Sequence, residues 1–355
     1  MAARHHGLGS RMGAVWRARS AAWRRRQTLP WAFGLSALAA LGAAAAPLEP
    51  VTLVLHWQHQ AQFAGYYMAL AKGSYEQQGL QVQIARGGAD VDGGQMLRAG
   101  RADFASFMLS SALEARAAGL PLVHLAQVAN RSNFLLVAWQ EPPTGAPIRE
   151  LSDLDGRRVS VWPGSLRTPY LALFAAAGVR PVILPQYTTF SLFLKHGADA
   201  FAGMRYNEYH TLLQSGVLEE QVRVFALRDH GVNLPEDGLY CLAETWQRRA
   251  QTCRALALAS LEGWRYARDH EDETLDVVMG YVERDQRPTN RTHMRWMLKV
   301  MLAAVFPGPG DDWTVGRLAR PAYAQTVEML TRYADLRDAP HYEDLVVNGV
   351  PDEPR

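Results

Sequence analysis

Aromatic and amide side chains gather directly after an apolar run, and such side chains can stack on a small planar ligand and hydrogen-bond to its edge. The run covers residues 51–55 and has the character of a β-strand. The candidate ligand residues that follow it are Trp57, Gln60, Gln62, Gly65 and Tyr66. Gly65 begins a helix-like run and offers free backbone N–H groups. Three glutamines in five residues are unusual in a core, although Trp57 and Phe63 could belong to one.

Three further passages follow apolar runs in the same way. Their candidate ligand residues are Phe107, Ser110, Trp162, Ser165, Asn207 and Glu208. Ser165 stands at a helix start, where its hydroxyl could bind an anion or cap the helix, and capping is the commoner role. Asn207 and Glu208 stand between tyrosines, which suits a nitrogen-rich aromatic ligand, and a helix cap explains them equally well.

The sequence offers no pattern for covalent, metal or nucleotide chemistry. The glycine pairs at 87–88 and 93–94 lack the spacing and the lysine of phosphate-binding loops. Neither a Gly-x-Ser-x-Gly nor a His-Glu-x-x-His motif is present. His56 and His59 flank Trp57, but no cysteine or second histidine cluster completes a metal site. We therefore expect a protein that is not an enzyme and that holds no cofactor and no metal.

The elements that must position these residues recur in the same order in two halves of the chain. In the first half a helix-like run ends at Gly79, a strand-like run follows, and a Gly-x-Ala-Asp string ends at Asp103. In the second half the corresponding run ends at Gly178, and a Gly-Ala-Asp string ends at Asp199. This repetition predicts a duplicated α/β lobe. Ligands of open α/β sheets bind beyond the carboxyl ends of the strands, so the candidate residues should line an interlobe cleft.

The predicted domain order is a signal peptide at 1–45, the first part of lobe one at 46–138, lobe two at 139–235, and a return strand with a helical tail at 236–355. The tail should pack on lobe one, because an open α/β sheet needs helices over both faces. Two lobes joined by two crossing segments make a hinged cleft. The expected fold class is therefore a two-lobed α/β fold.

Charge separates the leader from the body of the chain. The first 45 residues carry seven arginines and no acid, so the formal charge of +2 for the whole chain leaves −5 for residues 46–355. A net-acidic body lacks the excess of positive charge with which proteins bind nucleic acid, so we expect no nucleic-acid partner. The basic run at 24–26, the apolar stretch at 29–46 and its alanine-rich end predict a secretory signal peptide, cleaved after Ala45 by the general or the twin-arginine route. An uncleaved anchor is the alternative, and we expect a soluble periplasmic protein.

The chain has only two cysteines, Cys241 and Cys253, which excludes a disulfide scaffold. They are either free or paired with each other, and a strand-like setting for one and a helical setting for the other favours two free, buried thiols.

Trp57 and two motifs resemble the thiamine-pyrimidine family, which joins ABC-transporter substrate-binding proteins, among them formylaminopyrimidine binders, to hydroxymethylpyrimidine synthase, and two further motifs match a wider set that includes nitrate and aliphatic-sulfonate binders. The motifs are Gly65-Tyr66-Tyr67-x-Ala69-x-x-Lys72-Gly73-x-Tyr75, Gly79-Leu80-x-Val82, Gly100-x-Ala102-Asp103-Phe104 and Asp153-Leu154-x-Gly156-x-x-Val159. The resemblance spans residues 50–240 and implies a type II periplasmic-binding-protein fold. It also implies that Trp57 and the Gln60/Gln62 loop contact a pyrimidine that Asn207 and Glu208 face from lobe two.

The resemblance implies a periplasmic solute-binding protein of an ABC importer. Its partners would be a small nitrogenous or anionic ligand and the permease and ATPase subunits, with contact to the membrane only through the permease. The chain departs from the family in two ways: the first loop carries glutamines where asparagines are usual, and the two cysteines lie outside the matching motifs, so the iron-binding motif of the synthase is missing. A pyrimidine-precursor synthase and an extracytoplasmic ligand sensor are the alternatives.

Overall fold

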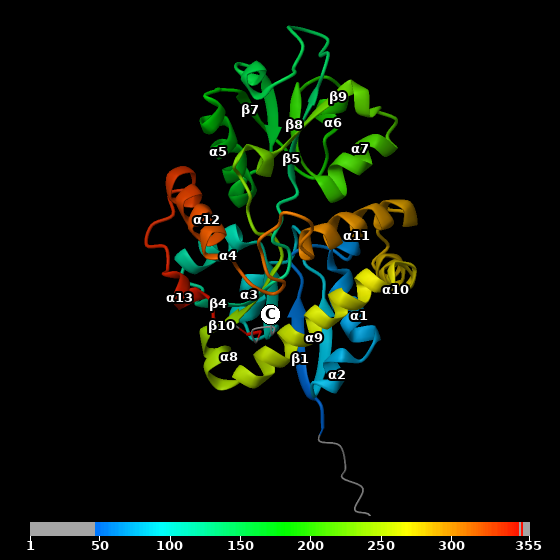
Figure 1. The fold of residues 1–355 in the computed structure, drawn as a ribbon, viewed down its shortest axis with the longest axis vertical. Coiled ribbons are helices and arrows are strands. Elements are labelled where there is room, and N and C mark those ends of the chain that lie inside the picture. Colours follow the sequence, from blue (N-terminus) through cyan, green and yellow to red (C-terminus); the bar gives the residue numbers. More distant parts are fainter. Residues whose placement is uncertain (1–46, 348, 351–355) are drawn as a thin grey trace, which may run out of the picture. The chain divides into compact units, whose positions relative to one another are not determined.

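The computed structural model describes residues 47–347 and 349–350, and the leader predicted at 1–45 lies outside them. Two five-stranded sheets organise the described chain, each at the centre of one lobe (Figure 1). The first sheet has the order β2-β1-β3-β10-β4. Its strands are β1 (Glu49–Val54), β2 (Leu80–Ala85), β3 (Phe104–Phe107), β4 (Leu122–Gln127) and β10 (Gly238–Leu242).

The second sheet repeats this topology with the order β7-β6-β8-β5-β9. Its strands are β5 (Phe134–Trp139), β6 (Arg158–Val161), β7 (Val182–Pro185), β8 (Ala200–Met204) and β9 (Val222–Ala226). In each sheet four strands run in the same direction, and one strand that arrives from the other lobe runs antiparallel to its two neighbours. The predicted two-lobed α/β fold is therefore confirmed.

The first crossing comes earlier than the predicted boundary after residue 138. β5 begins at Phe134 and pairs with β8 and β9, so it belongs wholly to the second lobe. All six residues of β5 are buried, and such a continuous apolar run gives no local sign of which sheet it joins. The return crossing leads into β10 at Gly238, close to the predicted boundary at residue 236.

Helices cover both sheets. They are α1 (Ala64–Ala71), α2 (Ser74–Gln77), α3 (Gly93–Arg98), α4 (Leu109–Ala117), α5 (Thr168–Ala177), α6 (Ser191–Leu194), α7 (His210–Gln214), α8 (Ala243–Arg248), α9 (Ala250–Asp269), α10 (Glu271–Arg284), α11 (Arg291–Val305), α12 (Arg320–Tyr333) and α13 (Tyr342–Leu345). The helix-like run up to Gly79 is two helices, because Gly73 adopts φ 71° and breaks the ladder between α1 and α2.

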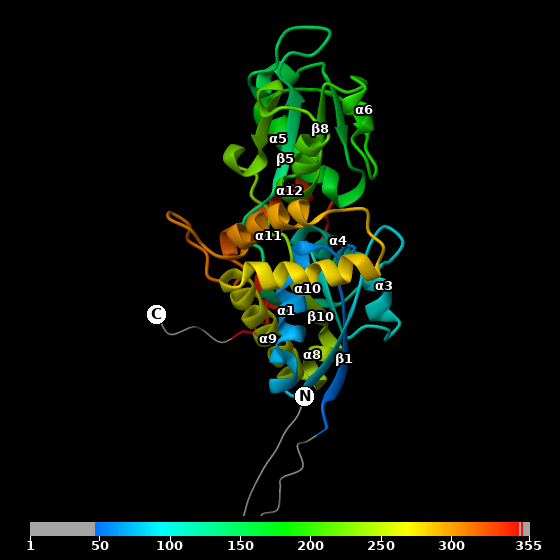
Figure 2. The ribbon, with the colours of Figure 1, turned by 90° about the vertical axis from the view of Figure 1, so that its right-hand side faces the viewer.

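The helical tail packs on lobe one as predicted and also reaches lobe two. α9 and α10 lie against α1 of the first lobe. α11 contacts the first lobe at the 3-10 turn η1 (Ala61–Phe63) and the second at α7 and the π-helical turn η4 (Arg205–Tyr209). α12 packs between α4 and α5. Figures 1 and 2 show α11 and α12 at the level where the lobes meet.

Cys241 on β10 and Cys253 on α9 are free and buried, and their Sγ atoms lie 3.8 Å apart. The strand and the helix therefore bring the two thiols closer together than their separate settings in the sequence indicate.

Candidate functional site

The lobes meet at the carboxyl ends of their parallel strands. β3 leads into α4 in the first lobe, and β6 leads through the 3-10 turn η3 (Gly164–Arg167) into α5 in the second. The hydroxyls of Ser111 on α4 and Ser165 on η3 lie 3.1 Å apart. No side chain caps η3 or α5, so Ser165 bonds across the lobes instead of capping a helix. A pocket of about 370 Å³ lies beside this contact, and it is lined by Glu114, Gly164, Ser165, Arg167, Thr168, Leu171, Tyr333 and Ala334.

A polar network occupies the carboxyl ends of β1 and β3. Gln60 Nε2 donates to Gln62 Oε1 at 2.6 Å, and Gln62 Nε2 lies 2.9 Å from His56 Nε2. His56 Nδ1 lies 2.8 Å from Ser106 Oγ. Burial lowers the pKa of His56 to about 4, so the ring is neutral at pH 7. Because the Gln62 amide donates to Nε2, the ring proton of His56 sits on Nδ1 and points to Ser106.

Two buried carboxylates join this network from the return crossing. Asp237 Oδ1 accepts a hydrogen bond from Tyr66 at 3.1 Å and lies 3.8 Å from His56 Nδ1, whereas Oδ2 has no partner among the described residues. The adjacent Glu236 accepts hydrogen bonds from the backbone and side-chain nitrogens of Asn133 on the other crossing segment. Burial raises the pKa of Asp237 well above its ordinary value and that of Glu236 to about 7. An unpaired buried carboxylate is costly, so Asp237 is a strong candidate for a ligand contact.

The candidates from lobe two lie on η4. Glu208 Oε2 accepts from the backbone N–H of Met204 at 2.8 Å, and Oε1 accepts from Asn207 Nδ2 at 2.8 Å. Each oxygen thus accepts one hydrogen bond within the turn, as the capping alternative requires, and keeps a second lone pair that could accept from a ligand. Burial raises the pKa of Glu208.

Tyr206 of η4 connects the two groups of carboxylates electrostatically. Its pKa is raised well above the ordinary value by burial and then by the charges of Glu236, Glu208 and Asp237. Acids from the return crossing and from lobe two therefore act on one buried phenol. We take this region as the candidate site.

The other predicted site residues make separate contacts. Trp57 is partly buried and packs on the core, as its alternative role requires. Phe107 lies edge-on to Tyr240 with ring centroids 5.8 Å apart, and Ser110 is buried at the start of α4. Trp162 Nε1 donates to the carbonyl of Tyr187 at 3.1 Å.

Gly65 lies in the first turn of α1, as the sequence predicts, and it also contacts the helical tail. A Cβ built on it would lie 2.2 Å from the indole of Trp264 on α9. Its missing side chain lets α1 and α9 approach closely, so its role is in helix packing.

Sequence reasoning missed Ser106, Glu236 and Asp237 and considered His56 only as a metal ligand. The sequence did carry a signal for Glu236 and Asp237, because both acids directly precede the return strand β10. That strand is antiparallel to its neighbours and therefore starts beside their carboxyl ends. Within residues 47–347 and 349–350, no group of three or more His, Cys, Asp or Glu could hold a metal. No helix of this described part is long and apolar enough to span a membrane.

Comparison with known proteins identifies a matching family and a curated relative. The family described as NMT1/THI5 like matches residues 60–274. The chain is 26% identical over 251 residues to the riboflavin-binding protein RibY of Chloroflexus aurantiacus, and the match covers 67% of this chain and 68% of RibY.

Two solved structures share the fold. The periplasmic aliphatic sulphonate binding protein SsuA of Escherichia coli matches with a TM-score of 0.64 at 14% identity, over 86% of this chain and 94% of that chain. The alkanesulfonate-binding protein SsuA of Xanthomonas axonopodis pv. citri, bound to MOPS, matches with a TM-score of 0.60 at 16% identity, over 86% of this chain and 100% of that chain. These matches confirm the periplasmic-binding-protein fold and do not carry over a ligand.

Proposed function

We propose, from the premise that this chain belongs to the NMT1/THI5-like family, that it is an exported solute-binding protein that delivers a small nitrogenous ligand to an ABC importer. Its partners are the permease and ATPase subunits of that importer. The periplasmic setting of the structural relative from Escherichia coli supports export, as does the leader that the sequence predicts at 1–45.

One observation carries the nitrogenous class over the anionic class: the candidate site is acidic. Asp237, Glu236 and Glu208 are carboxylates that act together on Tyr206, and Asp237 Oδ2 has no hydrogen-bond partner among the described residues. Burial raises the pKa of each of these acids, and a ligand with N–H donors or positive charge stabilises their ionised form, so the site favours such a ligand and disfavours a sulfonate. Tyr206, on which these acids act, and Trp57, which follows His56 of the polar network in the chain, supply aromatic rings that favour a planar ligand.

Two planar heterocycles fit this description. A thiamine-precursor aminopyrimidine is the ligand that the family resemblance implies. Riboflavin is the ligand named for the relative from Chloroflexus aurantiacus, and its ring system also presents an N–H donor. The binding experiment below separates the two.

The alternatives use the same cleft in other ways. A pyrimidine-precursor synthase would need reactive groups at the candidate site, whereas the two cysteines contact each other between β10 and α9. An extracytoplasmic sensor would bind the same ligand and differ only in the partner that reads the closed form.

Native mass spectrometry of protein from the periplasmic fraction tests the proposal in one measurement. The intact mass should correspond to a chain that begins near Ala46, and a co-purified small molecule should appear as an adduct. Titration calorimetry with an aminopyrimidine, riboflavin and an alkanesulfonate should then give micromolar or tighter binding for a heterocycle only. Tight binding of the sulfonate alone would overturn the nitrogenous class, and a membrane-retained chain that keeps the segment predicted as a signal peptide would overturn export.

Variants locate the site. Trp57→Ala, Asp237→Asn and Glu208→Gln should each weaken heterocycle binding about ten- to a hundredfold, because each removes a stacking contact or a charge-assisted hydrogen bond of about 1.5–3 kcal/mol. Glu76→Gln, at an exposed position on α2, is the matched control and should bind like the wild type. A loss of more than about 3 kcal/mol of unfolding free energy in ligand-free Trp57→Ala would show instead that Trp57 is a core residue.

A further inference from the structure

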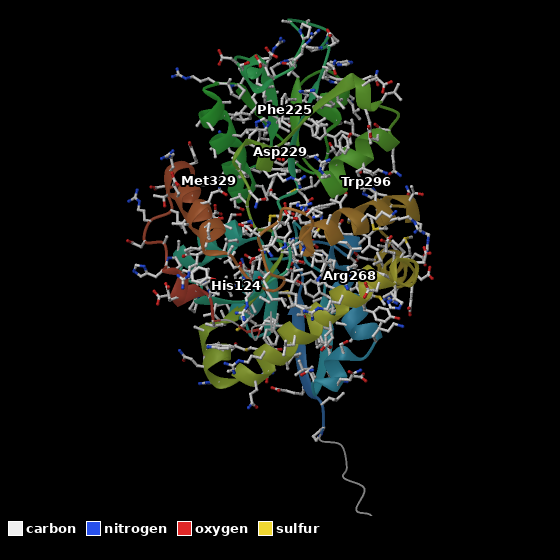
Figure 3. All side chains as sticks on the ribbon, in the orientation of Figure 1. His124, Phe225, Asp229, Arg268, Trp296 and Met329 are labelled. Atoms are coloured by element: carbon white, nitrogen blue, oxygen red, sulfur yellow. The ribbon has the colours of Figure 1, made fainter. Side chains whose placement is uncertain are left out.

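The tail helix α11 packs against lobe two through a stack of aromatic rings. The ring of His210 on α7 lies parallel to that of His293, with centroids 5.1 Å apart, and to the indole of Trp296, with centroids 4.8 Å apart. Trp296 Nε1 also donates to the carbonyl of Arg205 on η4 at 2.8 Å. Figure 3 labels Trp296 where α11 meets the second lobe.

A series of hydrogen bonds joins this stack to the candidate site, and the donor and acceptor of each bond follow from those of its neighbour. Glu208 Oε1 needs a donor, so Asn207 turns its Nδ2 toward Glu208 and its Oδ1 toward His293 Nε2, 3.1 Å away. His293 therefore carries its proton on Nε2 and leaves Nδ1 bare. His210 Nδ1, 2.8 Å from His293 Nδ1, must supply the proton of that bond.

We propose that His210 and His293 form an acid-sensitive clasp between α11 and lobe two that positions Asn207 and Glu208 for the ligand. The positioning role rests on the function proposed above, whereas the clasp itself does not. Both histidines are positioning residues, because they reach the ligand only through Asn207 and Glu208.

The chemistry of the pair sets the direction of the pH effect. One added proton can sit on His210 Nε2 without loss of the bond, but a second proton on His293 Nδ1 removes the acceptor and places two like charges side by side. Burial, and then the charge of His210, lower the pKa of His293 to about 4, and burial lowers the pKa of His210. Released histidines would titrate near their ordinary value of 6.5, so the clasped arrangement is favoured above that pH and loses stability as the pH falls from 6.5 toward 4.

Other charged groups face the pair. On η4 they are Arg205 and Glu208, and burial lowers the pKa of Arg205 and raises that of Glu208. On α11 they are Arg291 and Arg295, which form ion pairs with Asp276 and Asp272 of α10. α7 contributes His210 itself. Because burial also raises the pKa of Glu236 in the candidate site to about 7, a variant that removes only a histidine is needed to separate the histidines from these acids.

Hydrogen exchange of the ligand-free protein tests the clasp without a ligand. After correction for intrinsic exchange rates, amides in residues 205–214 should lose about tenfold or more of their protection between pH 8 and pH 5. His210→Phe keeps a stacking ring but cannot titrate, so its protection should not change with pH. His270→Phe is the matched control, since exposed His270 stacks on Tyr266 away from the clasp, and it should behave like the wild type. Wild-type protection that is independent of pH, or an unchanged pH effect in His210→Phe, would overturn the clasp.

Binding of riboflavin and an aminopyrimidine from pH 8 to pH 5 tests the positioning role. Wild-type affinity should weaken as the pH falls, and His210→Phe should flatten this profile. A flat profile in a wild-type protein that binds one of these probes would overturn the positioning role. If neither probe binds at any pH, the proposed ligand class fails, while the exchange experiment still decides the clasp.

Discussion

At the scale of single residues, the contact between α1 and α9 depends on two glycines that face each other's helix. A Cβ on Gly65 would lie 2.2 Å from Trp264, and a Cβ on Gly263 would lie 2.1 Å from the carbonyl oxygen of Gly65. Real Cβ atoms do not approach this closely, so a side chain at either position would force the two helices apart. The fully buried Trp264 and Tyr66 would lose their packing with them.

We therefore predict that Gly65→Ala destabilises the protein by about 1–3 kcal/mol or more, as overpacking of a filled core does. Urea unfolding followed by circular dichroism measures this. Gly280→Ala is the matched control, because Gly280 lies within α10 and its Cβ would meet only the flexible Arg284 side chain at 3.9 Å. This control should gain up to about 1 kcal/mol from helix propensity. Equal effects of the two substitutions would contradict the packing role of Gly65.

At the scale of elements, Glu236 links the two crossing segments through hydrogen bonds. It accepts the backbone and side-chain N–H groups of Asn133, 103 residues away in the sequence. Burial raises its pKa from 4.5 to about 7, so the folded protein binds more protons than the unfolded chain between these values. This group therefore stabilises the fold less as the pH rises from 4.5 to 7, with a total change of about 3 kcal/mol at most.

Glu236→Gln cannot ionise, so we predict that its unfolding free energy, relative to wild type, increases between pH 4.5 and pH 8. Urea titrations at several pH values would measure that difference, and the other titrating groups cancel in the comparison. A difference that stays constant over this pH range would show that Glu236 ionises normally in the folded protein.

The elements also show where the sequence was informative. Glycine stops, strand alternation and the repeated Ala-Asp strings are local signals, and from them the two α/β lobes and the tail on lobe one were predictable. The partners of β5 and the break at Gly73 were not, because a buried run pairs equally well with either sheet and a glycine is compatible with both a helix and its end. For the candidate site, the amide and carboxylate passages were found, but the Asp237–Tyr66 bond joins residues 171 positions apart, which no local pattern reveals.

At the scale of the whole molecule, segments from both lobes meet on two sides of the crossing segments. Ser111 and Ser165 meet on one side, where α12 also packs between α4 and α5. His210 and His293 meet where α11 reaches lobe two. Asp237 is fully buried in this arrangement, so a ligand can reach it only when the lobes separate. Binding should therefore require opening and closing about the two crossing segments.

A reversible cross-link between the lobes tests this requirement. The Ser111 and Ser165 hydroxyls are 3.1 Å apart, close enough for a Ser111→Cys/Ser165→Cys double variant to form a disulfide with small side-chain shifts. We predict that the oxidised double variant binds the heterocycle at least about tenfold more slowly than wild type, because the lobes cannot part, and that reduction restores the rate. Stopped-flow fluorescence measures the rate, and alkylation with intact-mass analysis verifies that only the new cysteines are oxidised while Cys241 and Cys253 stay free. Each single substitution is a control without a cross-link and should bind at the wild-type rate. Unchanged binding by the oxidised double variant would mean that the ligand reaches its site without separation of the lobes, which would move the site from the buried carboxylates to the open pocket beside Ser165 and Arg167.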